Sequence, residues 1–157
     1  MSTDRPRVFH LLGNLIRFHA FPGETGDHCA IIEMVTAPGG GAPPNHHAGE
    51  DENFFILEGR FSFMLNGETF EAGPGEFVKI PDGALHAFTC ISETPGRFLQ
   101  INAPGHAHEM FFTEAGDVLP DDTRDVPAPD GPPDLPRIMA LSEKAGLTVV
   151  VPEGAPG

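Results

Sequence analysis

The sequence predicts an all-β fold in which many short strands close into a barrel. Glycine and proline account for 19 and 17 of the 157 residues, which breaks helices early and favours strands joined by tight turns. Short apolar runs follow one another at the even spacing that is typical of a barrel or jelly roll. Asn66-Gly67, between two of these runs, is the dipeptide that best suits a type I′ hairpin.

The expected strands occupy the first two thirds of the chain. They span residues 15–20, 29–35, 53–58, 60–65, 77–80, 87–91 and 98–101, with a loop over 39–44. The strand over 29–35 is apolar at both parities, so both of its faces should be covered, one by the barrel interior and one by a second sheet or subunit. We therefore expect a homodimer.

The chain beyond residue 103 has a different character. A helix is expected over 107–115, followed by a Pro- and Asp-rich stretch over 116–134 that should run extended across the barrel. A second helix should span 136–145, with Asp134 near its start and Gly146 past its end, and a last strand should span 147–151. We expect residues 1–103 to form the barrel and residues 104–157 a C-terminal extension packed on it.

Charge and cysteine usage exclude several classes of protein. The net charge of −14 repels the phosphates of nucleic acids and of membrane surfaces. Residues 1–7 are polar rather than signal-like, and no run approaches the roughly 18 apolar residues of a membrane span. Cys29 and Cys90 lack Cys-x-x-Cys spacing and should be small buried hydrophobes. We expect a cytoplasmic protein that binds a small-molecule substrate and contacts neither nucleic acid nor membrane.

Two gapped motifs hold the residues that point to chemistry. The first runs from Gly39 to Gly59 as GGGAPPNHHAGEDENFFILEG, and the second from Gly75 to His86 as GEFVKIPDGALH. In this order and at this separation they resemble the two motifs of the cupin family, in particular small single-domain bacterial cupins of the Cupin_2 type with a quercetinase-like barrel. The resemblance covers about residues 8–103. It implies an RmlC-like double-stranded β-helix, or jelly-roll barrel, with a short helical extension.

The resemblance also implies a site for one divalent transition metal ion, with His47, Glu52 and His86 as ligands. Alternate residues of a strand face the same side, so ligands from neighbouring strands can converge inside a barrel. Imidazole and carboxylate together suit Fe, Mn, Ni, Co, Cu or Zn, and residue type does not choose among them.

The first ligand position departs from the family pattern. Counting back four residues from Glu52 makes His47 the second histidine of the pair and puts Asn45 in the place of the first, as a weak oxygen ligand or a neighbour of the ligands. In the other register His46 is the first ligand and Ala48 replaces the second. The five-residue gap after Gly39 favours Asn45.

Other histidines fit a metal site less well. His106 and His108 imitate the His-x-His pattern, but no glutamate follows at the ligand spacing. We expect both to be exposed at the start of a helix, although a helix there could cap the barrel mouth and bring one of them near the substrate. His10, His19 and His28 are isolated and are expected to be structural.

Strand parity predicts the walls of the pocket. Phe54 and Ile56 should face the same side as Glu52, and Phe88 the same side as His86, so all three are candidate substrate-binding residues. The resemblance implies a metal-dependent dioxygenase, similar to quercetin 2,3-dioxygenase, that acts on a small apolar or aromatic molecule with Glu52 as the catalytic base. A non-catalytic binding or sensor cupin and a cupin isomerase are the alternatives, because the fold hosts many activities.

Overall fold

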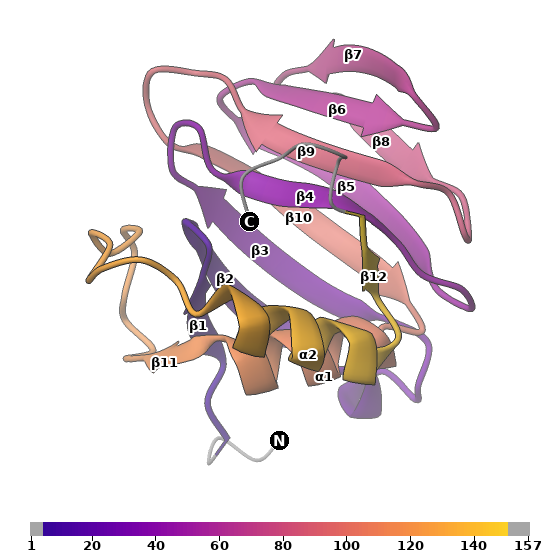
Figure 1. Ribbon diagram of the computed structural model, residues 1–157, viewed down its shortest axis with the longest axis vertical. Helices are drawn as coiled ribbons and strands as arrows, with labels where there is room; N and C mark the ends of the chain where they lie inside the picture. The colour runs from indigo at the N-terminus through magenta and orange to yellow at the C-terminus, as the bar shows by residue number, and fades with distance from the viewer. Residues whose placement is uncertain (1–4, 151–157) are drawn as a thin grey trace.

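Two antiparallel sheets face one another in the computed structural model, which describes residues 5–150 (Figure 1). The strand orders are β11-β1-β2-β3-β10-β5-β8 and β12-β4-β9-β6-β7. The strands are β1 (Val8–Leu11), β2 (Asn14–Ala20), β3 (Ala30–Thr36), β4 (Gly41–His46), β5 (Asp51–Glu58), β6 (Phe61–Leu65), β7 (Glu68–Ala72), β8 (Phe77–Ile80), β9 (His86–Cys90), β10 (Gly96–Ala103), β11 (Asp117–Leu119) and β12 (Thr148–Val149). The predicted all-β jelly roll is confirmed.

Aromatic side chains fill one end of the space between the sheets. Phe98 lies at the centre of this group, with its ring centroid 5.1 Å from those of Phe54 and Phe61 and 5.3 Å from that of Phe88. Alternation along the strands puts these rings inside, since side chains on a strand point to opposite faces in turn. Burying each ring contributes about 1.5–3 kcal/mol, so this group holds the two sheets together.

The predicted hairpin is confirmed, and its turn uses the expected backbone geometry. Asn66 and Gly67 both have positive φ, 50° and 87°. They join β6 to β7, with Leu65 paired to Glu68. A type I′ turn needs positive φ at both central residues, which glycine and asparagine tolerate best.

The loop expected over residues 39–44 was wrong, because β4 already begins at Gly41. Pro43 and Pro44 lie inside this strand although proline cannot donate to a ladder. In the structure both prolines fall where the β4–β9 register shifts, between the pairs Ala42–Phe88 and Asn45–His86. The strand therefore tolerates them without losing its partner.

Two helices lie side by side at one end of the sheets (Figure 1). They are α1 (His106–Ala115) and α2 (Leu135–Ala145), each within one residue of the predicted span. The Asp134 carboxylate accepts from the Arg137 amide at the start of α2, and Gly146 ends it with a φ of 93°. No helix of residues 5–150 is long and apolar enough to cross a membrane.

The segments around these helices differ in part from expectation. The stretch predicted to be extended contains β11, which pairs with β1 and lengthens the first sheet. The predicted last strand is β12, which pairs with β4, while Val151 lies outside the described residues. Cys29 is half-buried and Cys90 buried, and both are free. The division of the chain at residue 103 stays a prediction.

Apolar side chains lie on the outer face of the first sheet. Phe55 pairs with Phe77 on β8 and with Leu99 on β10, so these three side chains share one face, with Ile101 beside them. Phe77 is 63% exposed, which is unusual for so large an apolar side chain. We call these four residues the outer apolar face; the homodimer expected from the sequence, and the surface that it would use, stay predictions.

If the predicted homodimer forms through the outer apolar face, Phe77→Glu should raise its dissociation constant at least about tenfold, because a charge would be buried without a partner. Sedimentation velocity at micromolar concentration measures this. Val118→Glu, at an exposed site on β11 at the opposite edge of the same sheet, is the control and should leave the dimer intact. A wild-type chain that sediments as a monomer would contradict the prediction.

Candidate metal centre

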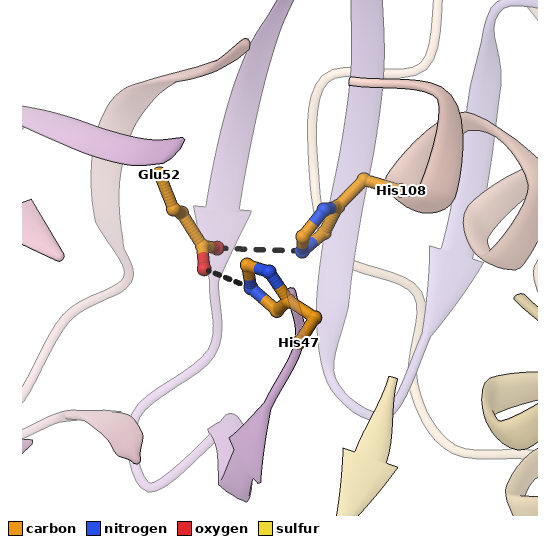
Figure 2. A group of neighbouring side chains, drawn as sticks. All are labelled: His47, Glu52 and His108. Atoms are coloured by element: carbon orange, nitrogen blue, oxygen red, sulfur yellow. Dashed lines mark hydrogen bonds and ion pairs between the residues drawn. The ribbon is translucent and has the colours of Figure 1, made fainter. Parts of the chain in front are cut away.

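Four buried ionisable side chains from four segments of the chain meet between the sheets. Glu52 lies on β5, His86 begins β9, His47 directly follows β4, and His108 lies in the first turn of α1. Glu52 Oε2 is 2.7 Å from His86 Nε2 and 3.1 Å from His47 Nε2, and Glu52 Oε1 is 3.5 Å from His108 Nε2. Figure 2 shows the rings of His47 and His108 pointing toward the Glu52 carboxylate. We call these four residues the His/Glu cluster.

The strands determine where three members of the cluster lie. On β5, Glu52 alternates with half-buried and exposed neighbours, so its side chain points inward. β4 and β9 pair with Asn45 opposite His86, which brings the end of β4 next to the start of β9. The Gly83 amide donates to the His47 carbonyl oxygen at 3.0 Å, so the loop before β9 also fixes the position of His47.

Hydrogen bonds fix the tautomers of two histidines. His86 Nδ1 lies 2.8 Å from the Ala84 carbonyl oxygen, and His108 Nδ1 lies 2.5 Å from Glu50 Oε1. Each Nδ1 therefore donates, and each Nε2, which faces Glu52, carries either a lone pair or a second proton. A lone pair would be repelled by the carboxylate, so the arrangement calls for a positive charge between these groups, either protons or a metal ion.

The cluster shifts the pKa values of its members. Burial by itself raises the pKa of Glu52, but the charge on His108 and the hydrogen bonds of His47 and His86 outweigh it and hold this pKa far below its usual range. Burial lowers the pKa of His86 and of His108, yet their contacts with Glu52, and with Glu50 for His108, raise both above the ordinary value. Without an ion, these pKa shifts favour an ionised Glu52 carboxylate beside protonated His86 and His108.

The donor set fits a divalent transition metal ion. Ligand atoms of His47, Glu52 and His108 all lie within 4.8 Å of one another, and His86 Nε2 faces the same carboxylate from outside this group. Imidazole nitrogen and carboxylate oxygen are ligands of the kind that Fe, Mn, Co, Ni, Cu and Zn accept. Gln100 Nε2 donates to Glu52 Oε1 at 2.6 Å and fixes the carboxylate from the side away from His47 and His86. Such supporting hydrogen bonds orient metal ligands in proteins. The residues present therefore fit the ion that the two motifs imply.

Of the predicted ligands, His47, Glu52 and His86 lie together, and Asn45 lies on the same cavity beside Glu52 and His86. Asn45 and His47 are both buried, whereas His46 between them is half-buried and pairs with Thr148 on β12. Asn45 therefore faces the interior and His46 does not, while the assignment of Asn45 as the first ligand stays a prediction. The Asn45 amide nitrogen donates to the carbonyl oxygens of Pro43 and His86, at 2.9 and 3.4 Å.

The expectation that His108 is exposed was wrong. His106 is exposed as predicted, but His108 is only 3% exposed and belongs to the cluster. No glutamate follows the His106–His108 pair at the ligand spacing. The partner of His108 is instead Glu50, which precedes it by 58 residues. The available signal was Glu50 itself, an acidic residue inside the first motif at a position that the motif does not use.

A cavity of about 230 Å³ adjoins the cluster. Strand parity is correct for the three predicted substrate-binding residues, since Phe54, Ile56 and Phe88 are all buried. Only Phe88 lines the cavity, however, because Phe54 and Ile56 pack in the hydrophobic core. Inward orientation was predictable from alternation, but the helices decide which part of the interior stays open.

Three comparisons with known proteins agree with this fold. Residues 32–102 match the family model of the cupin domain. The chain is 29% identical over 98 residues to an uncharacterized protein of Methanocaldococcus jannaschii, covering 62% of this chain and 78% of that one. It is 26% identical over 103 residues to quercetin 2,3-dioxygenase of Bacillus subtilis, covering 66% of this chain and 30% of the enzyme.

Among solved structures, the chain resembles a predicted oxalate decarboxylase from Thermotoga maritima. The TM-score is 0.59 at 17% sequence identity, over 65% of this chain and 96% of that one. At this identity the likeness shows the shared fold alone.

The geometry predicts that His47→Ala and His86→Ala each abolish stoichiometric binding of a divalent ion, because each removes an imidazole nitrogen that faces Glu52. Metal analysis after dialysis against Co²⁺ measures the ion bound per chain. The matched control is His28→Ala, at an exposed histidine outside the cluster, which should bind as the wild type does. Full metal content in either cluster variant would contradict the assignment.

Proposed function

We propose that this chain, a cupin, is a metal-dependent oxygenase that acts on a small, neutral, apolar or aromatic molecule. The observation that carries the proposal is the cavity, which ends at the His/Glu cluster. Its other walls are mostly aliphatic and aromatic, with Asn14, Asn45, Gln100 and Ser142 as the further polar residues. At about 230 Å³ it is smaller than the roughly 300–1,000 Å³ of sites for drug-sized ligands. A compact ring system is the kind of molecule that it suits.

The walls come from both parts of the chain. The barrel contributes apolar side chains from β1 to β4 and from β9, and the extension contributes the rest, namely Phe111, Phe112, Leu135, Ile138, Met139, Leu147 and Val149. These side chains keep water away from the cluster, which strengthens each electrostatic interaction there.

The charge of the lining excludes several substrates of other cupins. Within residues 5–150 the cavity is lined by no lysine or arginine, and its only carboxylate is that of Glu52. Phosphate and carboxylate groups are bound by such cations in proteins. This favours a neutral substrate over the sugar phosphate of an isomerase or the dianion of a decarboxylase.

The residues at the polar end of the cavity have distinct roles in the proposal. When bound, the ion supplies Lewis acidity, which lowers the pKa of a substrate hydroxyl, and a redox-active centre at which dioxygen is the oxidant. Glu52 accepts the proton of that hydroxyl, and the Gln100 amide holds the carboxylate in place. Asn45 lies beside them as a further polar contact for the substrate. Similarity to a quercetin 2,3-dioxygenase supports this reading but covers only 30% of that enzyme.

The proposal predicts a selective response to neutral aromatic compounds. The cobalt-, iron-, manganese-, nickel-, copper- and zinc-loaded proteins should be screened for oxygen uptake with neutral phenols and enols, and with carboxylates and sugar phosphates as comparison compounds. Uptake should occur only with the neutral group. If no metal-loaded form consumes oxygen with any neutral compound, while binding of such compounds is measurable, the protein is a binding module instead.

Within this screen, Ile138→Trp should raise KM at least about tenfold, because Ile138 lines the cavity and the larger ring would fill it. Ala140→Trp, at an exposed site on the same helix, is the control and should leave KM unchanged.

The role of Glu52 gives a separate prediction. Glu52→Gln keeps the shape and one oxygen ligand but is a far poorer base, so the variant should retain part of its metal and lose about 10²–10⁴ in kcat. The steady-state rate of oxygen uptake, normalised to the amount of bound metal, measures this loss of kcat. Wild-type kcat in the metal-loaded variant would show that the proton goes to another group.

A further inference from the structure

The barrel lacks one imidazole at the position where its strands would present one. Asn45 faces inward opposite His86, but its amide nitrogen is occupied by backbone carbonyl oxygens, those of Pro43 and of His86 itself. Asparagine supplies only a neutral oxygen, which is a weaker ligand than imidazole for the later divalent transition metals. A fourth ligand must therefore come from another element, or the ion keeps three.

Helix α1 brings such a ligand to the cluster from outside the barrel. The chain leaves β10 and turns at Gly105, which has a φ of 95°. A Cβ at this residue would lie 2.7 Å from Ala30 Cβ and 2.9 Å from the Asn102 carbonyl oxygen, so only glycine fits. The turn starts the helix directly beside the cluster, and His108 Nε2 faces the same carboxylate as the two barrel histidines.

Glu50 stabilises this arrangement at the N-terminal end of α1. It is only 4% exposed, and its two oxygens accept from the Ala107 amide at 3.1 Å and from His108 Nδ1 at 2.5 Å. The first contact satisfies an amide that the helix leaves unpaired, and the second fixes the tautomer that leaves Nε2 free for an ion. Glu50 is therefore a positioning residue that acts through His108.

We propose that α1 supplies, through His108 held by Glu50, the imidazole ligand that the barrel lacks at Asn45, so that ion binding fastens the C-terminal extension over the cavity. Phe111 and Phe112 on the same helix line the cavity, and α2 packs on α1, so a ligand bond to His108 holds the whole wall. The inference needs a bound ion but not oxygenase chemistry, and the two can fail separately.

The first test is the affinity for Co²⁺ alone, measured by competition with a chelating dye, together with the visible absorption spectrum of the bound ion. His108→Ala should weaken binding at least about tenfold and change the spectrum, and Glu50→Gln should weaken it by about 10–100-fold. His106→Ala, at the exposed histidine two residues earlier, is the matched control and should change neither. Wild-type affinity and spectrum in His108→Ala would overturn the proposal.

The second test moves the ligand back into the barrel. The double variant Asn45→His, His108→Ala has a histidine at the strand position and none at the helix position. Its affinity for Co²⁺ should therefore be higher than that of His108→Ala. The melting temperature shows whether the double variant is folded. If the folded double variant binds Co²⁺ no more tightly than His108→Ala does, the claim that His108 replaces the imidazole missing at Asn45 is wrong.

Amide hydrogen exchange then tests whether the ligand bond to His108 also stabilises the C-terminal extension. In the wild type, Co²⁺ should slow exchange in residues 106–115 and 135–145, because opening these helices breaks a ligand bond. In the double variant the ion should bind without slowing exchange there. Equal protection by the ion in both proteins, or none in the wild type, would show that His108 does not fasten the extension.

Discussion

The buried carboxylate of Glu52 must be paired inside the protein, and this requirement links the two sheets to the helical extension. A charge in the interior is costly unless it is paired and hydrogen-bonded. Its partners come from β9, from the end of β4 and from α1, with Gln100 of β10 as a further donor. Both sheets and the helical extension must therefore be in place before the charge is satisfied, which couples the site to the complete fold.

The two ends of the space between the sheets differ in what fills them. At one end the phenylalanine rings around Phe98 pack closely, and this end holds the sheets together. At the other end the cavity lies between the barrel and the two helices, and the His/Glu cluster forms one boundary of the cavity. A polar, charge-balanced site thus adjoins an apolar space, which is the combination that binds a neutral molecule by its shape and one polar group.

The extension contributes a side chain to the His/Glu cluster as well as part of the cavity wall. The region that matches the cupin domain ends at residue 102, whereas His108 and the aromatic residues of α1 lie beyond it. Family likeness alone would therefore describe a site with three ligands and an open mouth. The structure adds a third imidazole, that of His108, beside Glu52. The short, buried contact between Glu50 and His108 joins barrel and extension at this cluster.

Local sequence was enough to predict most of the strands, but not β1, β4 or β11. It also predicted the Asn66-Gly67 hairpin, both helices to within one residue, and the approach of His47, Glu52 and His86. These follow from local periodicity, turn chemistry and two spaced motifs, all of which act over a few residues. Tertiary structure alone decided that β4 tolerates two prolines, that Phe54 and Ile56 belong to the core, and that His108 joins the site. Each of these depends on partners far along the chain, as Glu50 and His108 do across 58 residues, and no local pattern encodes such a contact.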